Sequence, residues 1–280
     1  KENARKPLTR RFIITEGLFE NVGDLVNLPK LIELKQKYKF RIILDETWSY
    51  GVLGRTGGGV TEQQNVDASQ VDMIIGSLAG SLCGGGGFCA GSEEIVEHQR
   101  LSGNAYTFSA ALPAMLATTA SATTRMLQEQ PELLVALREN IRAMRAQLDP
   151  RSDWVACTSA ADNPVLMLVL KEDVVESRQL SAPEQDAIMQ DVVEEVRQVS
   201  KYFLCCIILL TLTKQCLANG VLITRLKSMP PPLGGTPRDE GWQPQSAVKV
   251  CVTTGLSKKE TEKAGVVIRH AITKIMTRRK

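Results

Sequence analysis

Residues 41–54 read Arg41-Ile42-Ile43-Leu44-Asp45-Glu46-Thr47-Trp48-Ser49-Tyr50-Gly51-Val52-Leu53-Gly54. The run from Arg41 to Asp45 is apolar until its acidic end, and such continuous apolar runs are typical of strands that are covered on both faces of a parallel sheet. A glycine-rich loop, residues 51–59, comes next. This stretch therefore predicts a buried strand whose carboxyl end carries an aspartate.

The segments on either side of this strand alternate between short β-rich runs and helical patterns. Upstream, Arg11–Glu16 reads as a strand and Leu28–Tyr38 as an amphipathic helix with Pro29 in its first turn. Downstream, two further strands are expected at Val71–Gly76 and Gly87–Gly91. Strands that alternate with helices indicate βαβ units and a largely parallel sheet.

The pattern of predicted helices and strands changes at about Asp149. Three further helical patterns precede that point, and they begin after Ser92, at Leu112 and at Pro131. Shorter strands and two helices come after it, at residues 164–170, 184–198, 220–226, 247–253 and 258–276. We therefore expect an α/β fold with two domains: a large domain with a mixed, mostly parallel sheet over residues 1–148, and a smaller α+β domain over residues 149–280.

Composition argues against several classes of function. The 280 residues include 34 Lys and Arg and 31 Asp and Glu, a formal net charge of +3, and the basic residues are spread along the chain, so nothing points to nucleic acid. The chain has two histidines, and its seven cysteines show no CxxC spacing. We therefore expect neither a zinc site nor a disulfide framework, but reduced thiols that face the cytosol. The cysteines are Cys83, Cys89, Cys157, Cys205, Cys206, Cys216 and Cys251.

One apolar run, Tyr202–Leu212, is unusual for this chain. Its 11 residues fall short of the roughly 20 that a helix needs to cross a bilayer, so a buried strand or helix is expected, with membrane contact as the alternative. The chain also begins with a polar lead, Lys1–Arg11, that has no initiator methionine. That beginning predicts an internal start with a missing upstream segment.

The order of several short motifs resembles the α-oxoamine synthases, the fold-type I pyridoxal-phosphate (PLP) enzymes that join an amino acid to an acyl-CoA. The motifs are Thr15–Phe19, Leu44–Gly54, Gly76–Leu82, Gly86–Phe88, His98–Gly103, Tyr106–Ala110 and Val248–Val250. Each motif is weak alone, but their order and spacing are specific. The resemblance implies an aspartate-aminotransferase-like fold with PLP as the cofactor.

The resemblance assigns Asp45 to the protonated pyridine nitrogen of PLP, because a carboxylate there makes the ring a better electron sink. An aspartate that only caps the strand is the alternative. Trp48 stands where catalytic relatives have a histidine, and an indole cannot act as an acid or a base. Gly80 stands where they have the lysine that forms the Schiff base, so the resemblance implies that this chain has no catalytic residue.

Three more residues have family-derived roles in binding. Lys249 aligns with the arginine that binds the substrate carboxylate; it keeps the charge but loses the bidentate fork, and a solvated lysine is the alternative. Thr107 and Ser109 stand where relatives bring hydroxyls across the dimer interface toward the partner's cofactor phosphate. Ordinary packing is the alternative for these two.

The missing lysine, the pair Phe88-Cys89 and the run His98–Gly103 resemble one branch, the non-catalytic subunits of serine palmitoyltransferase. Within that branch, Asp45-Glu46-Thr47 resembles the plant and algal versions. This resemblance implies a heterodimer in which a lysine-bearing catalytic subunit holds PLP. The shared site would condense L-serine with palmitoyl-CoA to 3-ketosphinganine in sphingolipid biosynthesis. The resemblance also implies the cytosolic face of the endoplasmic reticulum membrane, with membrane association through the missing upstream segment.

Two alternative functions remain, and one segment departs from the family. The chain is alternatively an independently active PLP-dependent acyltransferase that uses another lysine, or a truncated or mis-spliced product without function. In relatives the helix that ends near Gln198 runs almost directly into the segment that begins at Gln215, whereas here residues 199–214 intervene. We interpret this insertion as a retained intron or a gene-model error, because a splice-donor-like sequence would encode Val199-Ser200-Lys201.

Overall fold

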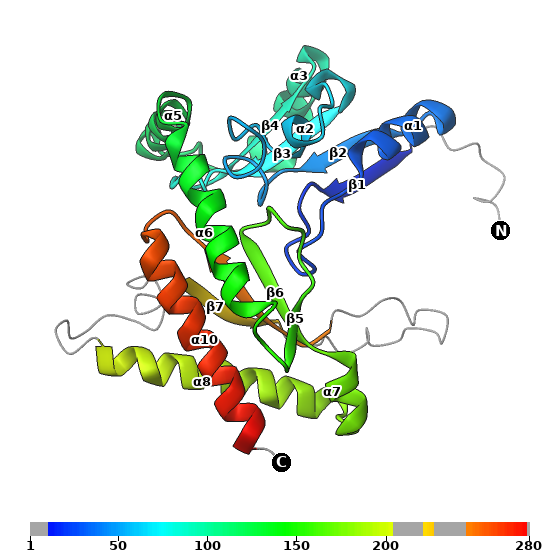
Figure 1. The fold of residues 1–280 in the computed structure, drawn as a ribbon. Helices are drawn as coiled ribbons and strands as arrows, with labels where there is room; N and C mark the ends of the chain where they lie inside the picture. Colours follow the sequence, from blue (N-terminus) through cyan, green and yellow to red (C-terminus); the bar gives the residue numbers. More distant parts are fainter. Residues whose placement is uncertain (1–10, 204–220, 227–244, 279–280) are drawn as a thin grey trace. The chain divides into compact units, whose positions relative to one another are not determined.

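The computed structural model describes residues 11–203, 221–226 and 245–278, with only the backbone for residues 197–203, residues 221–226 and Tyr106. Contacts divide the chain, drawn in Figure 1, into two compact units. The first extends to Phe19 and resumes over Leu25–Leu134, while the second takes Glu20–Asp24 and the chain from Val135 onward. The predicted domain boundary between residues 148 and 149 stays a prediction.

The first unit is built on a mixed sheet whose order, over the described residues, is β1-β2-β3-β4. The strands are β1 (Phe12–Glu16), β2 (Arg41–Asp45), β3 (Met73–Ser77) and β4 (Gly87–Gly91). β1, β2 and β3 are parallel, while β4 pairs antiparallel to β3 with Ser77 opposite Gly87. The predicted mixed, mostly parallel sheet is thereby confirmed, and the carboxyl ends of three strands meet at one edge.

Helix α1 (Leu28–Tyr38) packs against the sheet next to β2. The Asn27 side chain accepts a hydrogen bond from the backbone N–H of Lys30 at 3.2 Å, and Pro29 lies in the first turn, so the helix begins where its sequence predicts. Helix and strand share a core of buried side chains: Val26, Leu28, Ile32, Ile42, Leu44, Val60 and Val71. This core fixes β2 and with it the position of Asp45.

Further helices of the first unit are α2 (Val60–Gln63), α3 (Glu93–Ser102), α4 (Asn104–Thr107) and α5 (Ala114–Glu129). α3 and α5 lie where helical periodicity predicts them, with ends that differ by one or two residues. α2 and α4 are single turns of four residues. A single turn is too short to show the 3.6-residue period, so the sequence pattern does not predict it.

The second unit contains an antiparallel sheet whose order, over the part of the chain that the structure describes, is β5-β6-β8-β7. Its strands are β5 (Val155–Cys157), β6 (Val165–Leu170), β7 (Val221–Leu226) and β8 (Ala247–Val252). Its helices are α6 (Glu132–Leu148), α7 (Glu172–Ser177), α8 (Ala182–Phe203) and α10 (Lys258–Arg278), and α10 crosses α8 (Figure 1). The central strands β6 and β8 are buried at all but one position each.

The end of α8 differs from the sequence-based expectation. The helix was expected to end near Gln198, but it continues to Phe203 and so includes the first five residues of the predicted insertion. No proline or glycine stands between Glu184 and Phe203, so nothing in the sequence breaks the helix at Gln198. Residues 204–214, the rest of that insertion, lie outside the described residues.

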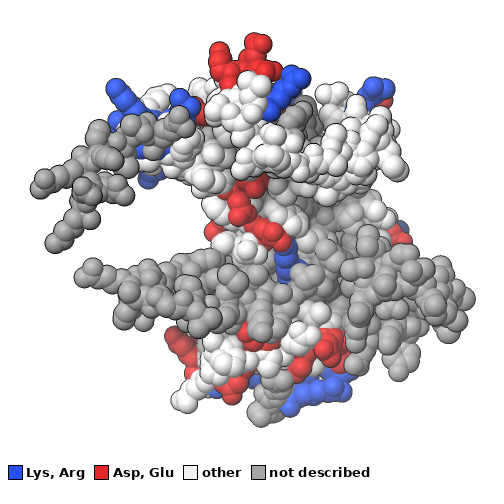
Figure 2. Space-filling model, turned by 180° about the vertical axis from the view of Figure 1, so that it is seen from behind, with Lys and Arg blue, Asp and Glu red and all other residues white. Residues whose placement is uncertain are grey.

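Surface charge, the character of the helices and the placement of possible metal ligands bear on three other classes of site. On the face drawn in Figure 2, charged side chains of both signs lie in small separate groups. None of the described helices combines the length and the apolar character needed to cross a bilayer. Within the described ranges, no three His, Cys, Asp or Glu side chains are placed to hold a metal ion.

Leu44→Ala is expected to lower the free energy of unfolding by about 3 kcal/mol, because it leaves a cavity in the core beside α1. Leu44 has an exposed fraction of 0%, whereas Ile14 on the neighbouring β1 is 72% exposed. The control Ile14→Ala should therefore change stability by less than about 1 kcal/mol. Urea unfolding of the two variants and the parent measures the difference, and equal losses would contradict the proposed core.

Candidate functional site

The carboxyl edge of β2 carries a buried carboxylate, Glu46, which directly follows Asp45. Only 1% of Glu46 is exposed to solvent. Its carboxylate accepts hydrogen bonds from the hydroxyl of Ser49 and from the backbone N–H of Val60, which lies 3.0 and 3.1 Å from the two oxygens. Glu46 therefore ties the end of the strand to the far end of the glycine-rich loop.

Burial raises the pKa of Glu46 above its usual range, because the charged carboxylate is poorly solvated there. The hydroxyl of Ser49 and the backbone groups of Val60 and Thr61 stabilise the charged form and oppose this shift, while the nearby charge of Asp45 adds to it. Burial is the largest of these effects. Glu46 consequently keeps its proton to a higher pH than a solvated glutamate does.

A second carboxylate, just beyond the glycine-rich loop, also binds to the loop. Glu62, on α2, accepts from the backbone N–H of Gly58 at 2.9 Å and from the N–H and the hydroxyl of Thr56 at 3.0 Å. The loop also closes on itself, since the N–H of Gly51 donates to the carbonyl of Gly57 at 2.7 Å. The loop is therefore held in one shape by side chains that lie outside it.

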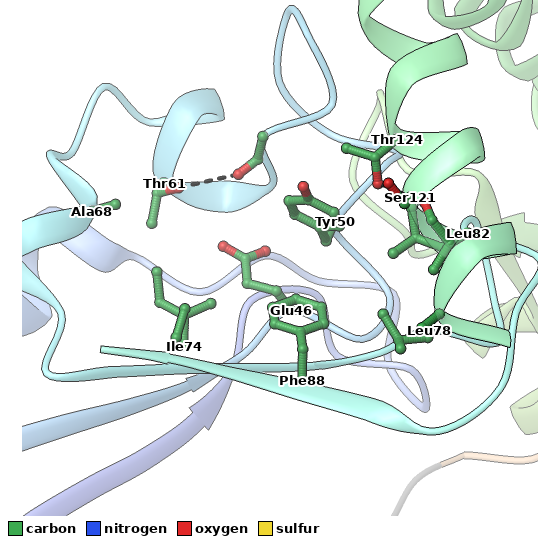
Figure 3. A pocket seen from close by; sticks show the side chains of 14 residues that line it. Glu46, Tyr50, Thr61, Ala68, Ile74, Leu78, Leu82, Phe88, Ser121 and Thr124 are labelled. Carbon is green, nitrogen blue, oxygen red and sulfur yellow. Dashed lines mark hydrogen bonds between the residues drawn. The ribbon is translucent and has the colours of Figure 1, made fainter. Parts of the chain in front are cut away.

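A pocket of about 540 Å³ lies beside this loop in the first unit (Figure 3). Its lining is mostly apolar, and Glu46 supplies the one carboxylate among its described lining residues. Tyr50 and Phe88 form part of the wall, where their rings meet edge to face with centroids 5.5 Å apart. A pocket of this size with few polar groups is typical of small-molecule sites.

Asp45, Trp48 and Gly80 lie around the backbone of Thr47. The Asp45 carboxylate accepts from the N–H of Thr47 at 2.8 Å, and a Cβ built on Gly80 would lie 3.9 Å from the Thr47 carbonyl. Half-buried Trp48 is the next residue along the chain. None of the three lines the pocket, whose wall takes their neighbours Glu46, Tyr50, Leu78 and Leu82.

Gly80 lies in the connection between β3 and β4, and it has room for a side chain. A Cβ at that position meets no atom closer than the Thr47 carbonyl at 3.9 Å. In the same connection, a Cβ on Gly84 would lie 3.0 Å from the Leu116 carbonyl, and Gly86 has a φ of +88°. Close packing and backbone conformation therefore require glycine at positions 84 and 86, but not at position 80.

The two hydroxyls with a family-derived role are exposed. Thr107 ends α4, and its hydroxyl donates to the carbonyl of Gly103 at 3.1 Å. Ser109 comes two residues later and is also exposed. Both therefore stand on the surface of the first unit, where the structure shows no contact between them and the group around Thr47.

Lys249 lies in the second unit, in the middle of β8, and it is buried. Its ammonium lies 2.6 Å from a carboxylate oxygen of Glu20. The alternative of a solvated lysine on a strand is therefore wrong. Inside the unit, the side-chain nitrogen of Lys249 is therefore paired with a carboxylate.

The part played by Glu46 was missed at the level of sequence. The resemblance to PLP enzymes implies a role for its neighbour Asp45 and none for Glu46. The missed signal is a second acidic residue between an apolar strand and a glycine-rich loop, with Ser49 three residues later. A carboxylate in that place can reach both a hydroxyl and a backbone N–H of the loop.

Comparisons with known proteins add a family context. The family model described as aminotransferase class I and II matches residues 1–222. Serine palmitoyltransferase 1 of Dictyostelium discoideum is 31% identical over 271 residues, which are 96% of this chain and 50% of that protein. Long chain base biosynthesis protein 1b of Oryza sativa subsp. japonica is 39% identical over 171 residues, which are 60% of this chain and 35% of that protein. The chain thus spans at most about half the length of these relatives.

This chain is also similar in fold to a solved structure. The serine palmitoyltransferase of Sphingomonas wittichii has a TM-score of 0.71 to this chain at 20% identity, and the match covers 98% of this chain and 58% of that one. At that identity the likeness shows the fold alone. Together with the family match, it confirms the expected PLP-transferase fold.

The residues at position 80 and around it do not suit covalent attachment of PLP. Gly80 has no amine, so it cannot form the Schiff base that lysine forms in catalytic relatives. Asp45 has the carboxylate that suits a pyridinium, and in this structure it accepts from the Thr47 N–H. Around position 80 the chain therefore has the carboxylate of Asp45 but no amine at Gly80.

Glu46→Gln is expected to flatten the dependence of stability on pH. A carboxyl group with a raised pKa in the folded state contributes stability that is fully present at low pH and is lost as pH rises through the folded pKa. Glutamine keeps an oxygen for the Val60 N–H and does not ionise. The free energy of unfolding of the variant, minus that of the parent, should therefore increase between about pH 4 and about pH 8 in urea titrations. Parallel profiles, equal to those of the exposed control Glu33→Gln, would contradict this.

Proposed function

Because the chain belongs to the class I and II aminotransferase family, we propose that it is a non-catalytic subunit of serine palmitoyltransferase. It supports the condensation of L-serine with palmitoyl-CoA to 3-ketosphinganine in sphingolipid biosynthesis. The observation that carries this proposal is Gly80, a position with open space for a side chain where catalytic relatives have the Schiff-base lysine. The names of the two curated relatives support the substrate class.

In this proposal a partner subunit supplies the lysine and holds PLP. When bound, PLP supplies an electron sink for bond breaking at the α-carbon of the amino acid. The contribution of this chain is a hydroxyl directed at the partner's cofactor phosphate. Ser109 is better suited than Thr107, because the Thr107 hydroxyl already donates to Gly103.

Exposed apolar side chains support a partner surface beside these hydroxyls. Phe108 stands between Thr107 and Ser109 and is 84% exposed, and Leu101 and Met115 are 77% and 73% exposed. Clusters of large exposed apolar side chains mark interaction sites on soluble domains. We assign this surface, along α3 to α5, to contact with the lysine-bearing subunit.

The remaining assignments concern substrate and location. Lys249 binds the carboxylate of L-serine in this proposal, because it retains the charge of the arginine that catalytic relatives use. In this proposal the chain is located at the cytosolic face of the endoplasmic reticulum membrane, because it is similar to a long chain base biosynthesis protein.

Co-expression tests the proposed function directly. The chain alone is expected to show no condensation of L-serine with palmitoyl-CoA, because it has no Schiff-base lysine at position 80. Co-purified with a lysine-bearing homologue, it should give 3-ketosphinganine, measured by mass spectrometry. Replacing the homologue's Schiff-base lysine with alanine should abolish the product. Activity of the chain alone would favour an independent enzyme, and failure to co-purify with any such homologue would sink the subunit proposal.

Gly80→Lys is expected to give the chain a covalent attachment point for PLP. After incubation with PLP and borohydride, the variant should carry about one PLP per chain at the introduced lysine, located by peptide mass spectrometry, whereas the parent and Gly80→Met show only background. Stability should change by less than about 1 kcal/mol because position 80 is open. Gly84→Lys, at a crowded position, should destabilise the chain. Background labelling of Gly80→Lys would show that more than the lysine has been lost.

A further inference from the structure

The pocket beside the glycine-rich loop takes its walls from several parts of the first unit. Ile74 and Phe88 come from β3 and β4. Tyr50 and Gly58 come from the segment that follows β2, and Ala117 comes from α5. All of these residues belong to one compact unit, so the pocket needs no part of the second unit.

The lining is apolar where the pocket is most enclosed. Leu82 is 2% exposed and Ala120 is 6% exposed, whereas Ala117 and Ser121, both on α5, are exposed. The pocket therefore has an apolar floor and opens to solvent along α5. A ligand with an apolar body that covers this floor removes apolar surface from water, and this favours binding.

Two hydroxyl groups stand at the rim of the pocket. In Figure 3 the side chains of Ser121 and Thr124 lie next to each other on the side that α5 forms. The Thr124 hydroxyl donates to the carbonyl of Ala120 at 2.9 Å, so its oxygen can still accept a hydrogen bond. The exposed Ser121 hydroxyl can donate as well as accept. The rim therefore suits a ligand that carries a hydroxyl group of its own.

The charge of the wall decides which ligands the pocket excludes. Its described lining includes no Lys, Arg or His, and Glu46 is the one carboxylate. Glu46 already accepts hydrogen bonds from Ser49 and Val60, and Asp45 lies beside it. An anion that entered would lose its water, gain no cation and be repelled by carboxylates. A neutral ligand of the same length avoids all three effects.

We propose that this pocket binds an uncharged, mostly apolar small molecule with one hydroxyl group, of the size of a medium-chain alcohol, and excludes the carboxylate of the same length. The hydrocarbon chain lies against Ile74, Leu78 and Phe88. The ligand hydroxyl bonds at the rim with Ser121 or Thr124. The pocket volume of about 540 Å³ is sufficient, since pockets of roughly 300 to 1,000 Å³ hold ligands larger than this.

Titration calorimetry of the 280-residue chain with octanol and, separately, with octanoate tests the inference. Octanol should bind saturably, and at least about tenfold more tightly than octanoate, because the acid must bring a charge into an apolar pocket. Hexanol should bind roughly tenfold more weakly than octanol, because it removes two fewer methylene groups from water. Equal affinities of the alcohol and the acid, or no saturable binding of octanol, would overturn the inference.

A matched pair of variants on α5 tests the location. Ala117→Phe places a ring at the pocket wall and should abolish octanol binding. Thr118→Phe, at an exposed neighbouring position that does not line the pocket, should bind as the parent does. Parental affinity in Ala117→Phe, or equal loss in both variants, would reject this pocket as the site.

A second measurement of the location needs no variant. In the parent saturated with octanol, nuclear Overhauser contacts are expected between the hydrocarbon chain of the ligand and the ring of Phe88. Saturable binding without these contacts would also reject the site. None of these readouts uses condensation activity or a partner subunit, so the inference does not rest on the proposed function, and either can fail while the other stands.

Discussion

The hydrogen bonds accepted by Glu46 are the constraint on which the first unit depends. A buried carboxylate at the end of β2 bonds to Ser49 and to the N–H of Val60, and so joins the strand to both ends of the glycine-rich loop. That loop supplies Gly58 to the pocket and leads into α2. If this carboxylate lost its partners, the desolvation cost of the buried group would fall on the folded state, and the pocket wall would lose its support.

The neighbouring carboxylates Asp45 and Glu46, at the end of β2, differ in burial and in the groups to which they bind. Glu46 is enclosed and bonded on the loop side, whereas half-buried Asp45 bonds only locally, to the N–H of Thr47, among the hydrogen bonds described. Glu46 holds the loop backbone, whereas the proposed function gives Asp45 the contact with the pyridinium nitrogen of PLP. In the proposed function, Gly80 and Trp48 stand where catalytic relatives have a lysine and a histidine, and the partner subunit supplies the chemistry.

Most regular elements of this chain follow from local sequence patterns, whereas its long-range contacts do not. The strand at residues 41–45 and the helix at residues 28–38 have the observed bounds, because apolar runs and capping residues act locally. The single turns α2 and α4 carry no periodic signal, and α8 continued beyond its expected end because no residue there stops a helix. The partner of Lys249 could not be predicted, since Glu20 is 229 residues away in the chain. Burial of that lysine follows from the sheet register, which no local pattern specifies.

The open space at Gly80 has a consequence for how such a chain can change over time. At position 84 neighbouring atoms oppose a side chain, and at position 86 the backbone conformation does. A substitution at either position would therefore destabilise the fold. Position 80 has neither constraint, so residues of many sizes can stand there with little loss of stability. Packing therefore leaves the choice of residue at position 80 to chemistry: in the proposed function, glycine is sufficient there only because a partner subunit brings the lysine.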